Sequence, residues 1–98
     1  MSVLLSSDLS DGSAIPYFTW DEPMTVSQFR QKLVSASPEE RSRLLGKLLR
    51  EAKDTDVWKF TSPSEIAKEW NSIVRHLGRR REFWKFHIDF WTKEGLIG

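Results

Sequence analysis

The chain contains no cysteine and only two histidines, His76 and His87, among its 98 residues. The absence of cysteine excludes a disulfide framework and thiolate chemistry, and it fits a reducing compartment. No glycine-rich phosphate loop, His-Glu-x-x-His motif or Gly-x-Ser-x-Gly motif occurs, and two histidines supply few ligands for a metal. We therefore expect no enzymatic activity, no cofactor and no metal site.

Long apolar runs are also missing. No stretch approaches the roughly 18 apolar residues of a membrane span, and the N-terminus lacks the basic region and apolar core of a signal peptide. These absences predict a cytoplasmic protein without membrane contact. The length and the 39% hydrophobic content suffice for one folded domain but leave no room for a second.

The net charge of +1 hides an uneven distribution. Residues 1–24 carry four acidic and no basic side chains, whereas residues 75–85 carry five basic side chains and one acidic side chain. We expect residues 1–14 to form a mobile acidic leader and residues 15–98 to form a single helical domain. The acidic region and the basic region either pair with each other or meet different partners.

Three local signals mark helix starts: a Ser or Thr cap followed three positions later by Gln or Glu. Two of these signals also place proline at the first helical position. Gly78 suits the position just after a helix, and Gly46 either marks close approach of another backbone or is merely tolerated. The sequence thus predicts an all-α, four-helix domain with helices at residues 26–35, 38–52, 63–77 and 80–94.

Two aromatic segments lie outside these helices. Residues 15–20 place three aromatic side chains beside Pro16, which predicts an extended arm packed on the domain; the alternative is an exposed docking motif. Residues 57–60 alternate as a short extended segment would. We expect the two segments to pair side by side.

The most unusual stretch is residues 78–91, where three arginines precede a helix rich in aromatic residues. Its apolar arc spans roughly 200°, about twice what a surface helix needs. The projection places Phe83, His87 and Phe90 on the inner face, which leaves part of the arc for a partner. The predicted protein-binding patch consists of Arg80, Arg81, Trp84 and Trp91.

An alternative function is DNA or RNA binding, because arginine binds phosphate through a planar fork and tryptophan stacks on bases. Against it, the first turn of a helix disfavours cations. The arginines could instead pair with Glu69, Glu82 or the acidic leader. The candidate contacts to nucleic acid are Arg75, Arg79, Arg80, Arg81 and Lys85.

Four segments carry a family resemblance: residues 16–23 (PYFTWDEP), 39–52 (EERSRLLGKLLREA), 54–60 (DTDVWKF) and 77–84 (LGRRREFW). Over residues 16–97 the chain resembles a small bacterial protein family encoded beside nucleotidyltransferase toxins of the abortive-infection type. The resemblance implies an accessory or antitoxin-like protein that binds a toxin partner, and it establishes no functional residues. A third interpretation is a homodimer that buries the surplus aromatic face by two-fold symmetry.

Overall fold

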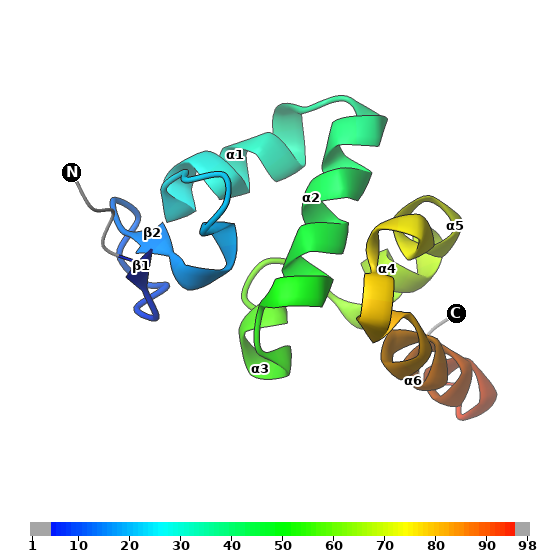
Figure 1. The fold of residues 1–98 in the computed structure, drawn as a ribbon. Coiled ribbons are helices and arrows are strands. Elements are labelled where there is room, and N and C mark those ends of the chain that lie inside the picture. Colours follow the sequence, from blue (N-terminus) through cyan, green and yellow to red (C-terminus); the bar gives the residue numbers. More distant parts are fainter. Residues whose placement is uncertain (1–4, 96–98) are drawn as a thin grey trace.

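The helix α2 (Pro38–Glu51) runs through the middle of the molecule, with the other elements on its two sides (Figure 1). The structure is a computed structural model that describes residues 5–95, so the predicted domain limits at residues 1 and 98 lie outside the described residues. α2 is buried along most of its length, including Lys47 on the face that its sequence pattern makes polar. A helix covered on several faces organises the domain around itself.

The elements on the N-terminal side of α2 are β1 (Leu5–Ser6), β2 (Ile15–Pro16), the 3-10 helix η1 (Tyr17–Thr19) and α1 (Val26–Ser35). Those that follow α2 are α3 (Asp54–Val57), α4 (Pro63–Lys68), α5 (Trp70–Ile73), the 3-10 helices η2 (Val74–His76) and η3 (Gly78–Arg80), and α6 (Arg81–Lys93). β1 and β2 form a two-residue parallel pair. The prediction of a small all-α domain is confirmed.

Helix starts follow the sequence signals. Thr25 and Gln28 form the capping box of α1, and the side chains of Ser37 and Ser62 accept hydrogen bonds from the third backbone amides of α2 and α4. These caps satisfy amides that have no partner within their own helix. Because the interactions span only three residues, the local sequence is enough to predict them.

The third predicted helix, at residues 63–77, is wrong as a continuous element. The chain leaves helical geometry at Glu69, whose φ and ψ are −104° and 14°, and continues as α5 and η2. Arg41 of α2 donates three hydrogen bonds to the Glu69 carboxylate at the break, between 2.8 and 3.2 Å long. A tertiary contact therefore lies where the local pattern favours an unbroken helix.

The two aromatic segments also differ from prediction. Residues 17–19 form a 3-10 helix, and the segment predicted as extended at 57–60 instead ends α3 and turns, with the Phe60 amide bonded to the Val57 carbonyl. Four alternating residues are too few to separate a strand from a helical turn. The segments still meet through side chains, because the rings of Phe18 and Phe60 lie 5.5 Å apart, edge to face.

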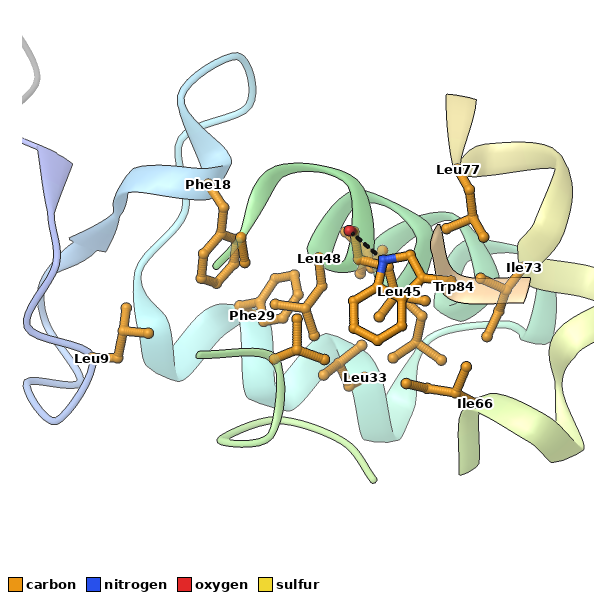
Figure 2. Close-up of a cluster of buried hydrophobic side chains, with 14 of the residues drawn as sticks. Leu9, Phe18, Phe29, Leu33, Leu45, Leu48, Ile66, Ile73, Leu77 and Trp84 are labelled. Carbon is orange, nitrogen blue, oxygen red and sulfur yellow. Dashed lines mark hydrogen bonds between the residues drawn. The ribbon is translucent and has the colours of Figure 1, made fainter. Parts of the chain in front are cut away.

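One core connects the two sides of α2 (Figure 2). Phe18 and Phe29 fill the end nearest the N-terminal elements, and Trp84 fills the end nearest α6. The leucines of α2 lie between these aromatic groups and are almost completely buried: Leu44, Leu45, Leu48 and Leu49. The buried apolar side chains of the described residues thus form one continuous cluster.

η2 crosses α2 at Gly46. A Cβ atom built on Gly46 would lie only 2.2 Å from the Cβ of His76, far inside contact distance. The glycine therefore permits the close approach of the two segments, which is one of the two explanations that the sequence left open.

The described part of the leader, residues 5–14, consists mainly of turns. Asp8 and Asp11 accept hydrogen bonds from Ser10 and Ser13, and the carbonyl oxygen of Gly12 accepts one from the Ser27 amide at the start of α1. Leu9 is buried. The leader thus contributes a cap to α1, while its mobility stays a prediction.

Within residues 5–95, no helix combines the length and the apolarity that crossing a bilayer requires.

Candidate interaction surface

α6 turns a different face to the body of the protein than the projection predicted. Trp84 is only 1% exposed and Ile88 is also buried, whereas Phe90, expected on the inner face, is 47% exposed. Phe83 and His87 are half-buried between these two edges. Trp84 belongs to the core, so its assignment to the protein-binding patch was wrong.

One buried hydrogen bond fixes the rotation of α6 together with the packing of Trp84 against Trp58. The indole Nε1 of Trp84 donates to the carbonyl oxygen of Leu49 at 2.8 Å (Figure 2). A buried indole N–H needs a partner, and the last carbonyls of a helix such as α2 are free to accept. Both edges of the apolar arc of α6 are aromatic, so the hydrophobic periodicity placed the middle of the arc, near His87, on the inner face. The periodicity did not predict that the Trp84 edge faces inward.

Trp58 covers the buried edge of α6 from α3. Its ring lies 5.8 Å from Trp84 and 5.7 Å from Trp91, edge to face in both pairs. Trp91, the other predicted partner-binding tryptophan, is half-buried and packs against the core. It therefore helps to hold α6 in place, and its contact with a partner stays a prediction.

The opposite edge of α6 is open. Phe86 is 67% exposed and Phe90 is 47% exposed, and the two side chains lie one helical turn apart. Together they leave roughly 200 Å² of aromatic surface uncovered. We call this surface the Phe86–Phe90 edge. Neither phenylalanine was in the predicted patch, and Phe90 was expected on the inner face.

Charges of both signs border the Phe86–Phe90 edge. Lys85 and Asp89 form an ion pair of 3.0 Å one turn apart, and both side chains are more than half exposed. Such a pair contributes about 0.5 kcal/mol or less. Glu82 and Lys93 are also exposed on this helix, so the border has no dominant sign.

The basic turn before α6, residues 75–81, contains both an arginine with a carboxylate partner and arginines without one. Arg80 donates a 2.6 Å hydrogen bond to Asp54 of α3, and its guanidinium stacks 4.4 Å from the centre of the Phe83 ring. Its pairing partner is none of the carboxylates that the sequence suggested. Arg80 links α3 to α6, and only part of it is available to a partner.

Arg75, Arg79 and Arg81 are exposed. Across residues 5–95, none of the three has a carboxylate within ion-pair distance, whereas Lys85 is paired with Asp89. Three of the five predicted nucleic-acid contacts thus have no ion-pair partner within the described residues. DNA or RNA binding by this turn stays a prediction.

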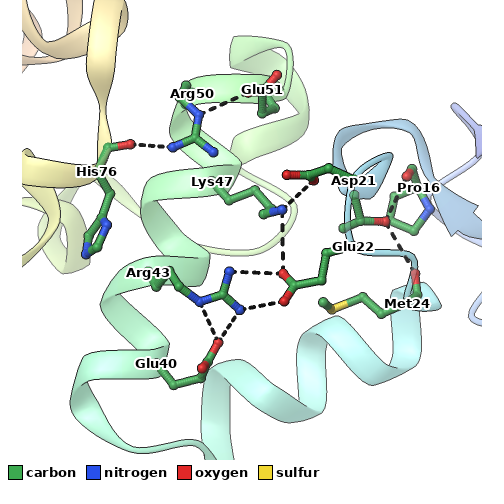
Figure 3. A network of polar contacts seen from close by, with 11 residues as sticks. Pro16, Asp21, Glu22, Met24, Glu40, Arg43, Lys47, Arg50, Glu51 and His76 are labelled. Atoms are coloured by element: carbon green, nitrogen blue, oxygen red, sulfur yellow. Dashed lines mark hydrogen bonds and ion pairs between the residues drawn. The ribbon is translucent and has the colours of Figure 1, made fainter.

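The acidic region before α1 meets α2 and not the basic turn (Figure 3). Glu22 accepts two hydrogen bonds from Arg43, of 3.0 and 2.8 Å, and Asp21 binds the buried ammonium group of Lys47. Hydrogen bonds from Arg43 and Lys47 lower the pKa of Glu22 and of Asp21, respectively. These pairs fasten the segment that follows the aromatic arm to α2. Asp21 and Glu22 therefore do not pair with the arginines of the basic turn.

The histidines lie in different surroundings. Burial, followed by the nearby Arg75, Arg50 and Arg43, lowers the pKa of His76, and His87 stacks on Phe83 with ring centres 4.4 Å apart. In the part of the chain that the structure describes, no three side chains of the metal-ligating types gather in one place.

Comparisons with protein families, with curated proteins and with solved structures found no match to this chain. The resemblance to a toxin-associated family, and the partner that it implies, therefore stay predictions.

Proposed function

We propose that this protein is a non-enzymatic interaction module that presents the Phe86–Phe90 edge of α6 to a protein partner. The observation that carries the proposal is the exposure of two phenylalanines on the same face of a firmly anchored helix. Helices that bind grooves use apolar side chains spaced three or four residues apart. Aromatic residues are among the strongest anchors of protein interfaces.

The anchoring of α6 supports this function. Trp84 is fixed by packing and by its hydrogen bond to Leu49, so the outward edge is held in one orientation before a partner arrives. A pre-ordered helix loses less conformational entropy on binding than a flexible segment does. The helix needs no folding step in order to bind.

The size of the edge favours a groove over a flat contact. A stable interface buries about 800 Å² on each partner, whereas the two phenylalanines leave roughly 200 Å² exposed. Flat pairing of two α6 helices through these side chains alone covers too little area. A groove that encloses α6 also reaches the half-buried His87 and Trp91 and the charged border.

For the identity of the partner, the resemblance implies the nucleotidyltransferase toxin encoded beside such proteins. We propose an antitoxin-like or accessory role in which that toxin offers an apolar groove to α6. The border of Lys85, Asp89 and Lys93 requires a groove whose own rim carries both signs.

The experiment is co-expression with the product of the adjoining gene, followed by affinity purification and measurement of the mass of the complex. Phe86→Ser and Phe90→Ser should each weaken the complex about tenfold or more, since anchor residues dominate interface energetics. Val34→Ser is the matched control, because Val34 is 87% exposed on α1 and lies outside the proposed surface.

Failure of the wild-type proteins to co-purify would exclude the toxin as the partner. Equal weakening by Val34→Ser would exclude the Phe86–Phe90 edge as the binding site. A dimeric mass of the protein alone that Phe86→Ser converts to a monomer would replace the toxin by a second copy of the chain.

A further inference from the structure

A hollow lies where the C-terminal end of α2 meets η3. Its volume is about 430 Å³, and it is lined by Arg50, Glu51, Gly78, Arg79 and Arg80. Arg50 is distant from the basic turn along the chain, since 28 positions separate it from Gly78. The fold brings three arginines to one concave site.

Two of the three arginines are held in position by the protein. The Nε of Arg50 donates to Glu51 at 3.0 Å, and its Nη1 donates to the carbonyl oxygen of His76 at 2.7 Å. Arg80 is held by Asp54 and by the Phe83 ring, as described above. These contacts use only some of the five N–H groups of each guanidinium.

The third arginine is free. Arg79 is exposed and has no carboxylate partner among residues 5–95. The Nε atom of Arg80 is buried and makes no hydrogen bond within the described residues. That buried Nε atom is out of reach of a ligand, so the donors left for one are the guanidinium of Arg79 and the remaining terminal N–H groups of Arg50 and Arg80.

The charge of the site is positive. Three arginines stand against the two carboxylates that position them, Glu51 and Asp54, which leaves one net positive charge at the hollow itself. Among the exposed residues next to these in the sequence, Lys53 and Arg81 are basic and Glu82 is acidic. α6 also begins here without a side-chain cap, so its dipole favours an anion at this end.

The backbone at the hollow is accessible. Gly78 has φ of +54°, and the nearest atom to its missing Cβ is the Cδ of Arg50, 3.7 Å away. Glycine at this position provides the turn that places Arg79 and Arg80 beside Arg50, and no side chain of its own fills the space.

We propose that this hollow binds the phosphate group of a nucleotide or of a nucleic-acid end. Guanidinium forks match the several oxygens of a phosphate, and arginine is the side chain best suited to bind phosphate through paired hydrogen bonds. Sites for small ligands begin at about 300 Å³, so the hollow holds more than a single phosphate. The site is separate from the Phe86–Phe90 edge and does not depend on the partner proposed for it.

Isothermal titration calorimetry with pyrophosphate tests the proposal on the full chain. Arg79→Gln should weaken binding about tenfold, because it removes a charge-assisted contact from an exposed position. Arg81→Gln is the matched control: it removes the same charge two residues away, from a side chain that does not line the hollow. We expect that control to change affinity less than about threefold, by screened long-range attraction alone.

Two further titrations identify the source of the phosphate. Tighter binding of ATP than of pyrophosphate indicates a nucleotide site. Tighter binding of a short 5′-phosphorylated oligonucleotide than of the same oligonucleotide with a 5′-hydroxyl indicates a nucleic-acid end. Phe86→Ser should bind each of these probes as the wild type does, which separates this proposal from the proposed protein interaction.

The proposal fails if pyrophosphate does not bind at millimolar concentration, or if Arg79→Gln and Arg81→Gln weaken binding equally. Equal weakening would mean general attraction by the basic turn and no defined site. Arg79→Lys, which keeps the charge without the fork, should bind with intermediate affinity.

Discussion

The indole nitrogen of Trp84 lies 2.8 Å from the carbonyl oxygen of Leu49, in the last turn of α2. In a longer helix that oxygen would accept from the backbone amide of Lys53, but this amide donates to the hydroxyl of Tyr17 instead. Two aromatic side chains, from the N-terminal arm and from α6, thus bond to backbone groups at the end of the central helix. The same end of α2 borders the arginine-lined hollow.

Trp84→Phe should lower the free energy of unfolding by about 2 kcal/mol. The phenyl ring retains most of the apolar contact but leaves the Leu49 carbonyl without its partner, and an unsatisfied buried acceptor costs about 1–3 kcal/mol. Urea denaturation followed by circular dichroism measures the change. The control is Trp20→Phe on the exposed Trp20, which should stay within about 0.5 kcal/mol of the wild type; equal stability of the two variants would contradict a role for the bond.

Tyr17 should ionise with a pKa of about 12, raised by burial and by its hydrogen bond to Asp56. It is the only tyrosine in the chain, so ultraviolet titration of tyrosinate reports on it alone. An unfolded tyrosine ionises near pH 10. The folded group therefore keeps its proton longer, and stability should fall as the pH rises from about 10 to 12.

Asp56→Asn should shift the midpoint of that titration downward without restoring it fully, because burial is the larger cause of the raised pKa. A midpoint near 10 in the wild type would mean that the hydroxyl is not held between Asp56 and Lys53.

Gly46→Ala should destabilise the protein by at least about 1 kcal/mol, although alanine favours a helix by about that amount. The added methyl group would lie 2.2 Å from the Cβ of His76, and overpacking of this kind costs about 1–3 kcal/mol or more. The test is a double-mutant cycle with His76→Gly, which removes the obstructing Cβ. A Gly46→Ala variant more stable than the wild type would contradict the close crossing of η2 over α2.

Stability should fall as the pH drops from about 7 to 5 because of His76. Burial lowers the pKa of this histidine in the folded protein, so the unfolded chain, with a pKa near 6.5, takes up the proton first. The lowered pKa values of Asp21 and Glu22 extend the loss below about pH 4.5. Urea midpoints across this range measure the effect, and His76→Gln should show a flatter dependence above pH 5; an unchanged slope would assign the effect elsewhere.

Some of the fold could be predicted because its causes are local. The caps at Thr25, Ser37 and Ser62 act over three residues, and each begins a helix at the predicted position. The burial of Phe18 likewise agrees with the expectation of an arm packed on the domain. The alternation at 57–60 was misleading, because so short a pattern does not distinguish a turn from a strand.

The candidate surface was harder to predict, because it depends on the rotation of one helix about its own axis. The sequence of residues 78–91 establishes a helix with apolar side chains on more than half of its circumference. Which side faces inward was settled by the carbonyl of Leu49, a group 35 positions away in the chain, and by the ring of Trp58. A pattern of local residues contains no information about such distant partners. The prediction therefore placed Trp84 at the surface and Phe90 in the core, whereas the structure has the reverse.

The basic turn shows the same division. Its three adjacent arginines and the glycine before them are evident in the sequence, and so is their excess of positive charge. Three further relationships appear only in the folded chain. Arg80 pairs with Asp54, and Asp21 and Glu22 pair with side chains of α2. Arg50 and Arg79 line one hollow. Helix caps and charge content follow from neighbours along the chain, whereas exposure and convergence follow from long-range packing against α2.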